Sequence, residues 1–197
     1  MSPKLLIPLF ALAILLSACS TEVITEEDRE LPAEGEQMDE VSFTGTLSEI
    51  PTESFIAFTG SKGAALSFEG KFNEFETAVE FAEGEPVSVS TTIQIKSMET
   101  DVQKLTDHLL NPDFFETETY EEATFTSSSV ELMEGGLYFV TGDLTIKDVT
   151  LEENITFNIT QNYIEGIHTI DRTLYNVGNA EDGVDLEVPL EFKVVLQ

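Results

Sequence analysis

This sequence has very little positive charge, a single cysteine and no tryptophan. Lys and Arg together number 9 against 38 Asp and Glu, which gives a formal charge of −29 at pH 7. So acidic a surface repels phosphodiesters, which excludes nucleic acid as a partner. Because Cys19 is the only cysteine, no disulfide can form within the chain. Only His108 and His168 can act as imidazole bases near neutral pH.

Motifs that carry catalysis are also missing. The sequence contains no serine nucleophile elbow, no Gly-rich phosphate loop and no His/Cys cluster with metal-ligand spacing. His108 falls in a helical segment, where a structural contact is the simpler role, and His168 has the alternating setting of an exposed strand residue. We therefore expect a protein that is not an enzyme, requires no cofactor and has no metal site. A group of buried carboxylates around either histidine would favour catalysis instead.

The one long apolar run lies at the N-terminus. Lys4 precedes apolar residues 5–16, and these are followed by Ser17, Ala18 and Cys19. Twelve helical residues rise roughly 18 Å, which is short of the ~30 Å hydrocarbon core, so residues 1–18 are expected to be a signal peptide. The sequence Leu-Ser-Ala-Cys over residues 16–19 resembles the bacterial lipobox. It implies an exported protein whose acylated Cys19 anchors it to a membrane of the cell envelope. Ser20 favours the periplasmic face of the outer membrane.

The composition changes abruptly after Cys19. Residues 20–40 hold nine carboxylates against the single Arg29, with few apolar side chains. Such a segment repels itself and is expected to be disordered, so residues 19–42 are interpreted as a lipidated cysteine and an acidic tether. Removing residues 1–18 takes away only Lys4, so the formal charge becomes −30.

Residues 43–197 are expected to form one β-rich domain. The dominant signal is alternation with period two, which places successive side chains on opposite faces of a strand. Polar residues fill the opposite positions, which is typical of antiparallel sheet with one solvated face. The apolar faces are residues 87, 89, 93 and 95; 138, 140, 144 and 146; 155, 157 and 159; and alternate residues from 186 to 196.

One segment has helical spacing. Apolar residues recur in that register from Asp101 to Leu110, Thr100 or Asp101 can cap the start, and Pro112 ends the helix. The predicted fold is therefore mainly β, with one short α-helix and either a sandwich or a closed antiparallel barrel of about eight strands. A barrel of that size has room for one slender ligand.

Several segments in order resemble the YceI-like family. They are residues 104–115, which read Lys-Leu-Thr-Asp-His-Leu-Leu-Asn-Pro-Asp-Phe-Phe; Tyr120 with residues 123–127; residues 138–150, which contain Gly-Asp-Leu-Thr-Ile-Lys-Asp-Val-Thr; and residues 170–173. The likeness spans roughly residues 54–196.

Two departures from the family pattern stand out. The early strand at residues 53–62 lacks the family's histidines, and Leu105-Thr106 replaces the Arg-Asp pair that often precedes its His-Leu element. Roles of those missing groups do not carry over.

The resemblance implies a lipocalin-like barrel around a long apolar tunnel that binds an isoprenoid lipid of quinone or polyprenyl type. Periodicity alone fits equally well a barrel filled by its own side chains, in which case the chain is a structural lipoprotein whose acidic surface binds a protein or divalent cations. The residues predicted to line the tunnel are Phe68, Ile93, Ile95, Leu109, Phe114, Phe115, Phe125, Leu144, Ile146 and Phe157.

Arg172 stands out in a chain with so few cations. It falls in the family-like Asp-Arg-Thr motif at residues 171–173, so we expect a specific partner: a carboxylate in the fold, or a polar headgroup at the barrel mouth. A polyprenyl phosphate would bring further negative charge to an acidic protein. A neutral headgroup such as a quinone is therefore favoured.

Overall fold

The computed structural model describes residues 43–160 and 162–197, and within them eleven strands form one sheet with one α-helix and two 3-10 helices. The predicted signal peptide, Cys19 and the tether lie outside the described residues. The elements are β1 (Gly45–Ser48), β2 (Phe55–Ser61), β3 (Ser67–Phe72), β4 (Phe75–Ala82), β5 (Glu85–Gln94), η1 (Ile95–Ser97), β6 (Met98–Thr100), α1 (Gln103–Leu109), β7 (Glu122–Leu132), β8 (Leu137–Ile146), β9 (Val149–Thr160), β10 (Tyr163–Asp171), η2 (Arg172–Tyr175) and β11 (Glu187–Val195).

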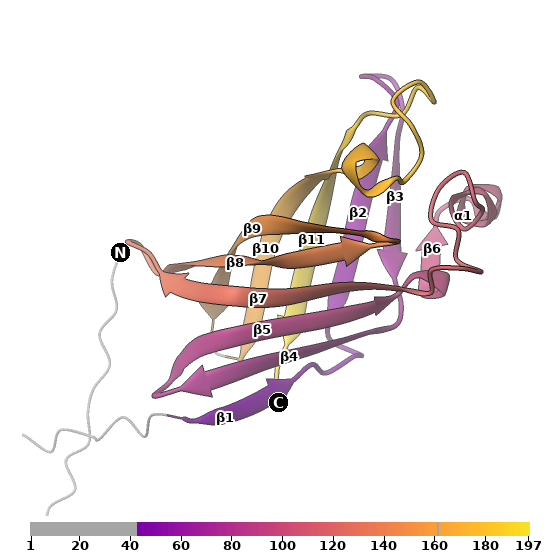
Figure 1. Cartoon of the computed structure of the whole chain (residues 1–197). Helices are drawn as coiled ribbons and strands as arrows, with labels where there is room; N and C mark the ends of the chain where they lie inside the picture. The colour runs from indigo at the N-terminus through magenta and orange to yellow at the C-terminus, as the bar shows by residue number, and fades with distance from the viewer. Residues whose placement is uncertain (1–42, 161) are drawn as a thin grey trace, which may run out of the picture. The chain divides into compact units, whose positions relative to one another are not determined.

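All strand pairs are antiparallel, in the order β1-β4-β5-β7-β8-β9-β10-β11-β2-β3-β6. The sheet curls into a barrel-like shape with α1 at one end (Figure 1). The two ends of this order are linked back to the sheet. Ser48, the last residue of β1, exchanges backbone hydrogen bonds of 3.2 and 2.9 Å with Gln197, which follows β11. At the other end, β6 pairs with β3 although it follows directly from β5 through η1.

The predicted mainly β, antiparallel fold is confirmed, but the described residues form eleven strands and not about eight. The additional elements include β1 and β6, which have four and three residues. Strands this short show no usable alternation, because a period of two needs several repeats to be recognised. Both form only when longer neighbours, β4 and β3, offer their edges.

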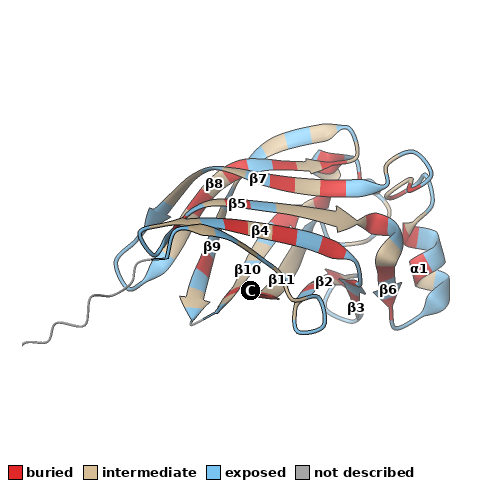
Figure 2. Ribbon diagram, turned by 90° about the horizontal axis from the view of Figure 1, so that it is seen from below, coloured by how far each residue is buried: buried red, intermediate tan, exposed pale blue. Residues whose placement is uncertain are grey.

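The alternation in the long strands places their apolar side chains inside. In β8, Val140, Leu144 and Ile146 are buried while Asp143 is exposed. Figure 2 shows the resulting bands of buried and exposed residues along the strands. Gly135 and Gly136 make the β7–β8 turn with φ of 91° and 82°, a region that glycine adopts without strain. The predicted face of β5 is wrong at Val87, which is 49% exposed near the start of that strand.

The helix forms where it was predicted, although one turn shorter and with a different start. The N-cap residue is Val102, which makes no side-chain cap hydrogen bond. The predicted cap Thr100 instead donates from Oγ1 to the carbonyl of Val102 and contacts the hydroxyl of Thr106 at 2.9 Å. Thr100 cannot cap α1 because it already belongs to β6, so its hydroxyl ties that strand to the helix.

Candidate functional site

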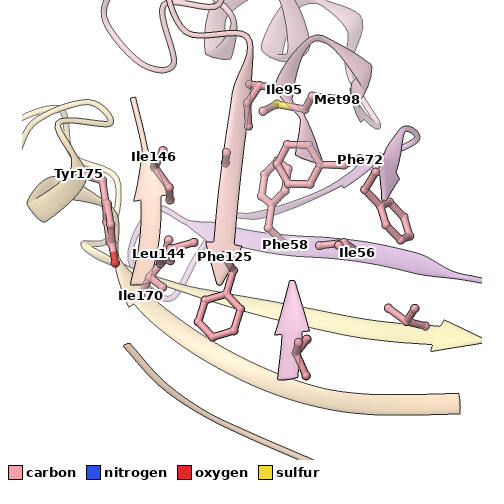
Figure 3. Close-up of a cluster of buried hydrophobic side chains, with 14 of the residues drawn as sticks. Ile56, Phe58, Phe72, Ile95, Met98, Phe125, Leu144, Ile146, Ile170 and Tyr175 are labelled. Atoms are coloured by element: carbon pink, nitrogen blue, oxygen red, sulfur yellow. The ribbon is translucent and has the colours of Figure 1, made fainter. Parts of the chain in front are cut away.

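The curled sheet encloses an apolar cavity of about 800 Å³ near the end that carries α1. This volume lies within the usual range for small-molecule sites, roughly 300–1,000 Å³. Its walls come from strands β2, β3, β5, β7, β8, β10 and β11, from η1, α1 and η2, and from the segments that follow α1 and η2. Figure 3 shows part of this wall, with Phe58, Ile95 and Ile146 converging from different elements. Such a cavity can hold a hydrocarbon chain out of water.

Eight of the ten predicted lining residues face this cavity: Phe68, Ile93, Ile95, Leu109, Phe114, Phe115, Leu144 and Ile146. Phe125 and Phe157 do not. Phe125 packs against Gly142, and Phe157 stacks on Tyr138 with ring centroids 5.7 Å apart, so both belong to the packed part of the core. The sequence pattern assigns both residues to the correct face of their strands. A pattern with a period of two does not show how far along the barrel axis a residue lies.

Several lining residues were missed. The sequence carried a signal for some of them, because Ile56 and Phe58 alternate in the segment that lacks the family's histidines, and Val188 and Leu190 lie on a face that was recognised as apolar. Ala123, Ile170 and Val177 gave no such signal.

Two glycines make room for aromatic rings on the wall formed by β2 and β3. Gly60 pairs with Phe68, and Phe58 pairs with Gly70. A Cβ on Gly60 would lie 2.1 Å from the Phe68 ring, and a Cβ on Gly70 would lie 2.2 Å from the Phe58 ring. Each ring therefore lies across the opposite glycine, which sets the shape of the cavity on this side.

Arg172 is 4% exposed and is held by the protein itself. Its Nη1 and Nη2 donate to the two carboxylate oxygens of Asp182 at 2.9 and 2.7 Å, so the carboxylate partner is the one observed. All of its N–H groups are engaged, which leaves none for a headgroup, so the predicted headgroup role is not assigned to it. The remaining acceptors are the carbonyls of Val177, Asn179, Val184 and Asp185, at 2.8–3.2 Å.

The same contacts shift the titration of Asp182. Burial alone raises its pKa, but hydrogen bonds from the Val184 N–H, the Arg172 guanidinium and the Asn179 N–H outweigh burial and hold the pKa below the ordinary value. Asp182 is therefore charged at neutral pH. The pair fixes the segment after η2, which forms one side of the cavity.

Lys147 connects two other wall segments. Its Nζ donates at 2.9 Å both to the carbonyl of Phe114, after α1, and to the carbonyl of Asn176, after η2. The Lys147 side chain is only 9% exposed. One ammonium group thus joins the segments that carry Phe114 and Val177, both of which line the cavity.

His168 is not the exposed strand residue that was predicted. Its side chain is 13% exposed, while its apolar neighbour Ile167 is 65% exposed. The reason is that β10 directs Ile164, His168 and Ile170 inward, opposite to what the polarity of residues 167 and 168 indicates. His168 Nε2 lies 3.1 Å from the Glu153 carboxylate, and the hydroxyl of the buried Tyr175 donates to the same carboxylate at 2.5 Å.

This polar cluster of Glu153, His168 and Tyr175 ties η2 to β9 and β10. Burial, then the hydrogen bond to Glu153, raises the pKa of Tyr175, so its hydroxyl stays protonated. Among residues 43–160 and 162–197, only the carboxylate of Glu153 meets His168, and none of the three cluster residues lines the cavity. His108 is exposed on α1, with its ring 4.9 Å from that of Phe114.

Two features are absent from residues 43–160 and 162–197. No group of three or more His, Cys, Asp or Glu side chains in this part of the chain is arranged to hold a metal ion. Nor is any helix in these ranges long and apolar enough to cross a membrane.

A curled antiparallel sheet around an apolar cavity places the chain in the class of barrel-like binding folds. Residues 49–196 match the model of the YceI-like domain, so the chain belongs to the YceI-like family. It is 40% identical over 99 residues to UPF0312 protein plu2095 of Photorhabdus laumondii, and this match covers 48% of this chain and 51% of that protein. It is 39% identical over 83 residues to Protein YceI of Escherichia coli O157:H7, and this match covers 41% of this chain and 43% of that protein. The matched part spans about half the length of these relatives.

Solved structures agree on the fold. BcnA of Burkholderia cenocepacia superposes with a TM-score of 0.70 at 28% identity, covering 75% of this chain and 98% of that one. A polyisoprenoid binding domain from Saccharophagus degradans, implicated in plant cell wall breakdown, gives a TM-score of 0.59 at 17% identity. The superposition covers 79% of this chain and 99% of that one. At that identity the second likeness shows the fold alone.

Proposed function

We propose that this chain binds the tail of a neutral isoprenoid lipid, of quinone or polyprenyl type, in the cavity, while an acylated Cys19 holds it at an envelope membrane. The observation that carries this proposal is the apolar cavity of about 800 Å³ inside the sheet. A barrel filled by its own side chains would leave no such space. The polyisoprenoid-binding description of the Saccharophagus domain supports the choice of ligand class.

Burial of the tail supplies the binding energy. Each CH₂ removed from water contributes about 0.8 kcal/mol, so eight such groups give roughly 6 kcal/mol before ordering costs. Ile, Val, Leu and Phe side chains from opposite walls provide that environment without any reacting group. Binding and carriage, and not turnover, is the role that such a lining supports.

The headgroup is expected to be neutral. The chain carries −29, and the one buried guanidinium, Arg172, is fully paired inside the fold. Among the described residues the Lys147 side chain is also largely buried, but its ammonium is engaged by two carbonyls, so a phosphate would meet repulsion that these buried cations do not offset. Quinone carbonyls need only hydrogen-bond donors, and Lys62, Ser67 and His108 stand among the residues that line the cavity.

The test is to identify the lipid that copurifies. The full chain carrying Cys19→Ser is purified from its native host, extracted with organic solvent, and the extract is analysed by mass spectrometry. We expect a quinone or another neutral polyprenyl lipid at near-stoichiometric yield. Recovery of a polyprenyl phosphate would refute the charge argument, and recovery of no lipid, with no binding of added quinone, would refute the binding function.

A matched pair of variants tests whether the lipid occupies the cavity. Ala123→Phe adds a ring to a buried position of the lining, whereas Ala57→Phe adds the same ring on the outer face of β2. We expect the first to lose most of the copurifying lipid and the second to keep it. Equal retention by both would place the lipid elsewhere.

A further inference from the structure

Two large apolar side chains stand exposed at the opening of the cavity. Leu66 is 58% exposed and Val102 is 57% exposed, yet both line the cavity. Val102 follows the end of β6 by two residues, Leu66 directly precedes β3, and the two strands pair through Gly70 and Thr100. The two side chains thus continue the apolar wall outward from the cavity interior. An exposed apolar patch in this position marks an interaction surface.

Lys62 is a cation next to this patch. It also lines the cavity, and its Nζ lies 3.3 Å from the point that a Cβ on Gly183 would occupy. No carboxylate in the described part of the chain lies within salt-bridge distance of Lys62. We call Lys62, Leu66 and Val102 the rim.

Charge is unevenly distributed between the cavity and the rest of the chain. The charged lining residues have a formal balance of only −1, whereas the whole chain carries −29. They are Lys62 and Arg172 against Asp101, Asp113 and Asp182. A surface containing phosphate groups therefore meets less repulsion at the cavity than the net charge of the chain implies.

A lipid tail needs such a surface in order to reach the cavity. The equilibrium constant for moving eight CH₂ groups from water into an apolar environment is about 10⁴. A lipid tail therefore leaves a bilayer through water only slowly. Contact between the opening and the bilayer removes that step. This argument rests on the proposed function, because it assumes that the cargo has a hydrocarbon tail.

We infer that the rim docks on a phospholipid bilayer with zwitterionic headgroups and that the lipid enters there. Leu66 and Val102 insert among the headgroups, and Lys62 meets a lipid phosphate. The zwitterionic class follows from the charge of −29, because an anionic bilayer would repel the remainder of the domain.

The absence of tryptophan from the sequence gives a clean reporter for docking. Leu66→Trp places a single indole on the rim. Leu132→Trp places one at an equally exposed position, 58%, where β7 enters the turn to β8, at the end of β7 away from the Ala123 that lines the cavity. Both variants are made in the full chain, so both keep whatever attaches the N-terminus to the bilayer.

With phosphatidylcholine vesicles that contain doxyl-labelled lipid, we expect the Leu66→Trp emission to shift to the blue. Its quenching should exceed that of Leu132→Trp by at least about twofold, as for an indole at the membrane interface. Equal quenching of the two variants, or none in Leu66→Trp, would overturn the inference. The same holds if the Leu66→Trp signal responds only to an added protein.

A transfer assay separates this inference from the proposed function. Leu66→Ser with Val102→Ser is compared with Leu132→Ser and Val87→Ser, using a fluorescent polyprenol and phosphatidylcholine vesicles. We expect the rim variant to take up the polyprenol roughly tenfold more slowly, a larger change than any in its equilibrium affinity, and the control variant to match the wild type. If no variant binds the polyprenol, the proposed function fails while the tryptophan result still decides the docking. Equal uptake rates for the rim and control variants would overturn the docking.

Discussion

Asp182 is charged because of the hydrogen bonds that it accepts from its neighbours. A substitution at Asp182 therefore tests what stabilises the cavity wall after η2. Replacing it by Asn removes the charge that balances the buried Arg172, whose guanidinium is left without its carboxylate. We expect Asp182→Asn to lower the free energy of unfolding by about 3 kcal/mol, because breaking a buried ion pair strands the remaining ion. Urea denaturation at pH 7 measures this loss. The control is Asp113→Asn at an exposed position, which should change stability by less than about 0.5 kcal/mol.

The same pair has a defined pH dependence. Because the folded-state pKa of Asp182 is depressed, its contribution to stability is complete above the ordinary value of 3.8 and is lost as the pH falls through the lower folded-state value. The difference in stability between wild type and Asp182→Asn should therefore be constant from neutral pH down to about 4 and shrink below it. A difference that already disappears between about pH 7 and 5 would contradict this assignment.

Tyr175 tests the polar cluster that ties η2 to the sheet. Its side chain is fully buried, and its hydroxyl donates to Glu153. Tyr175→Phe removes that donor and leaves the partly buried carboxylate of Glu153 with His168, so we expect a loss of about 1–3 kcal/mol in thermal or urea denaturation. Tyr138→Phe is the control, because Tyr138 makes a similar bond to Glu85 at a more exposed site. It should cost less than about 1 kcal/mol, and equal costs would show that burial is not the deciding factor.

Lys147 acts between elements, because one ammonium group holds the segments after α1 and after η2. Lys147→Met keeps the length of the side chain but removes both hydrogen bonds. We expect faster amide hydrogen exchange around Phe114 and Asn176 and a stability loss of about 2 kcal/mol. Lys71→Met is the control, because Lys71 makes only an exposed ion pair with Glu99. Unchanged exchange at both segments in Lys147→Met would show that they are held independently of Lys147.

For the whole molecule, attachment to a membrane is predicted to depend on Cys19. Cys19→Ser removes the thiol that acylation requires, so the protein should move from the membrane fraction to the soluble fraction when cells are fractionated. The thermal stability of the variant, compared with that of the wild type, serves as the control for correct folding. Continued tight association of Cys19→Ser with membranes would refute the lipoprotein hypothesis.

Alternation along the chain was sufficient to predict a mainly β, antiparallel fold with one helix, because a strand exposes its two faces in turn and this pattern is local. The ordered motifs from residue 104 to residue 173 were sufficient to identify the family that the comparison confirms. The pattern also placed Ile95, Leu144 and Ile146 on the inner surface, where they line the cavity.

Tertiary structure alone decided what a local pattern does not contain. Phe125 and Phe157 have the same alternation as the lining residues, but their depth in the barrel depends on how strands distant in sequence are staggered. Arg172 acquires its partners only when the chain folds back and brings the carboxylate of Asp182 to it. His168 faces inward because the pairing of β10 with β11 fixes its side of the sheet, and the polar Glu153 and Tyr175 meet it there. Register and the return path of the chain are set by contacts between remote segments, and so the sequence predicted most of the cavity wall but not which polar groups hold it in place.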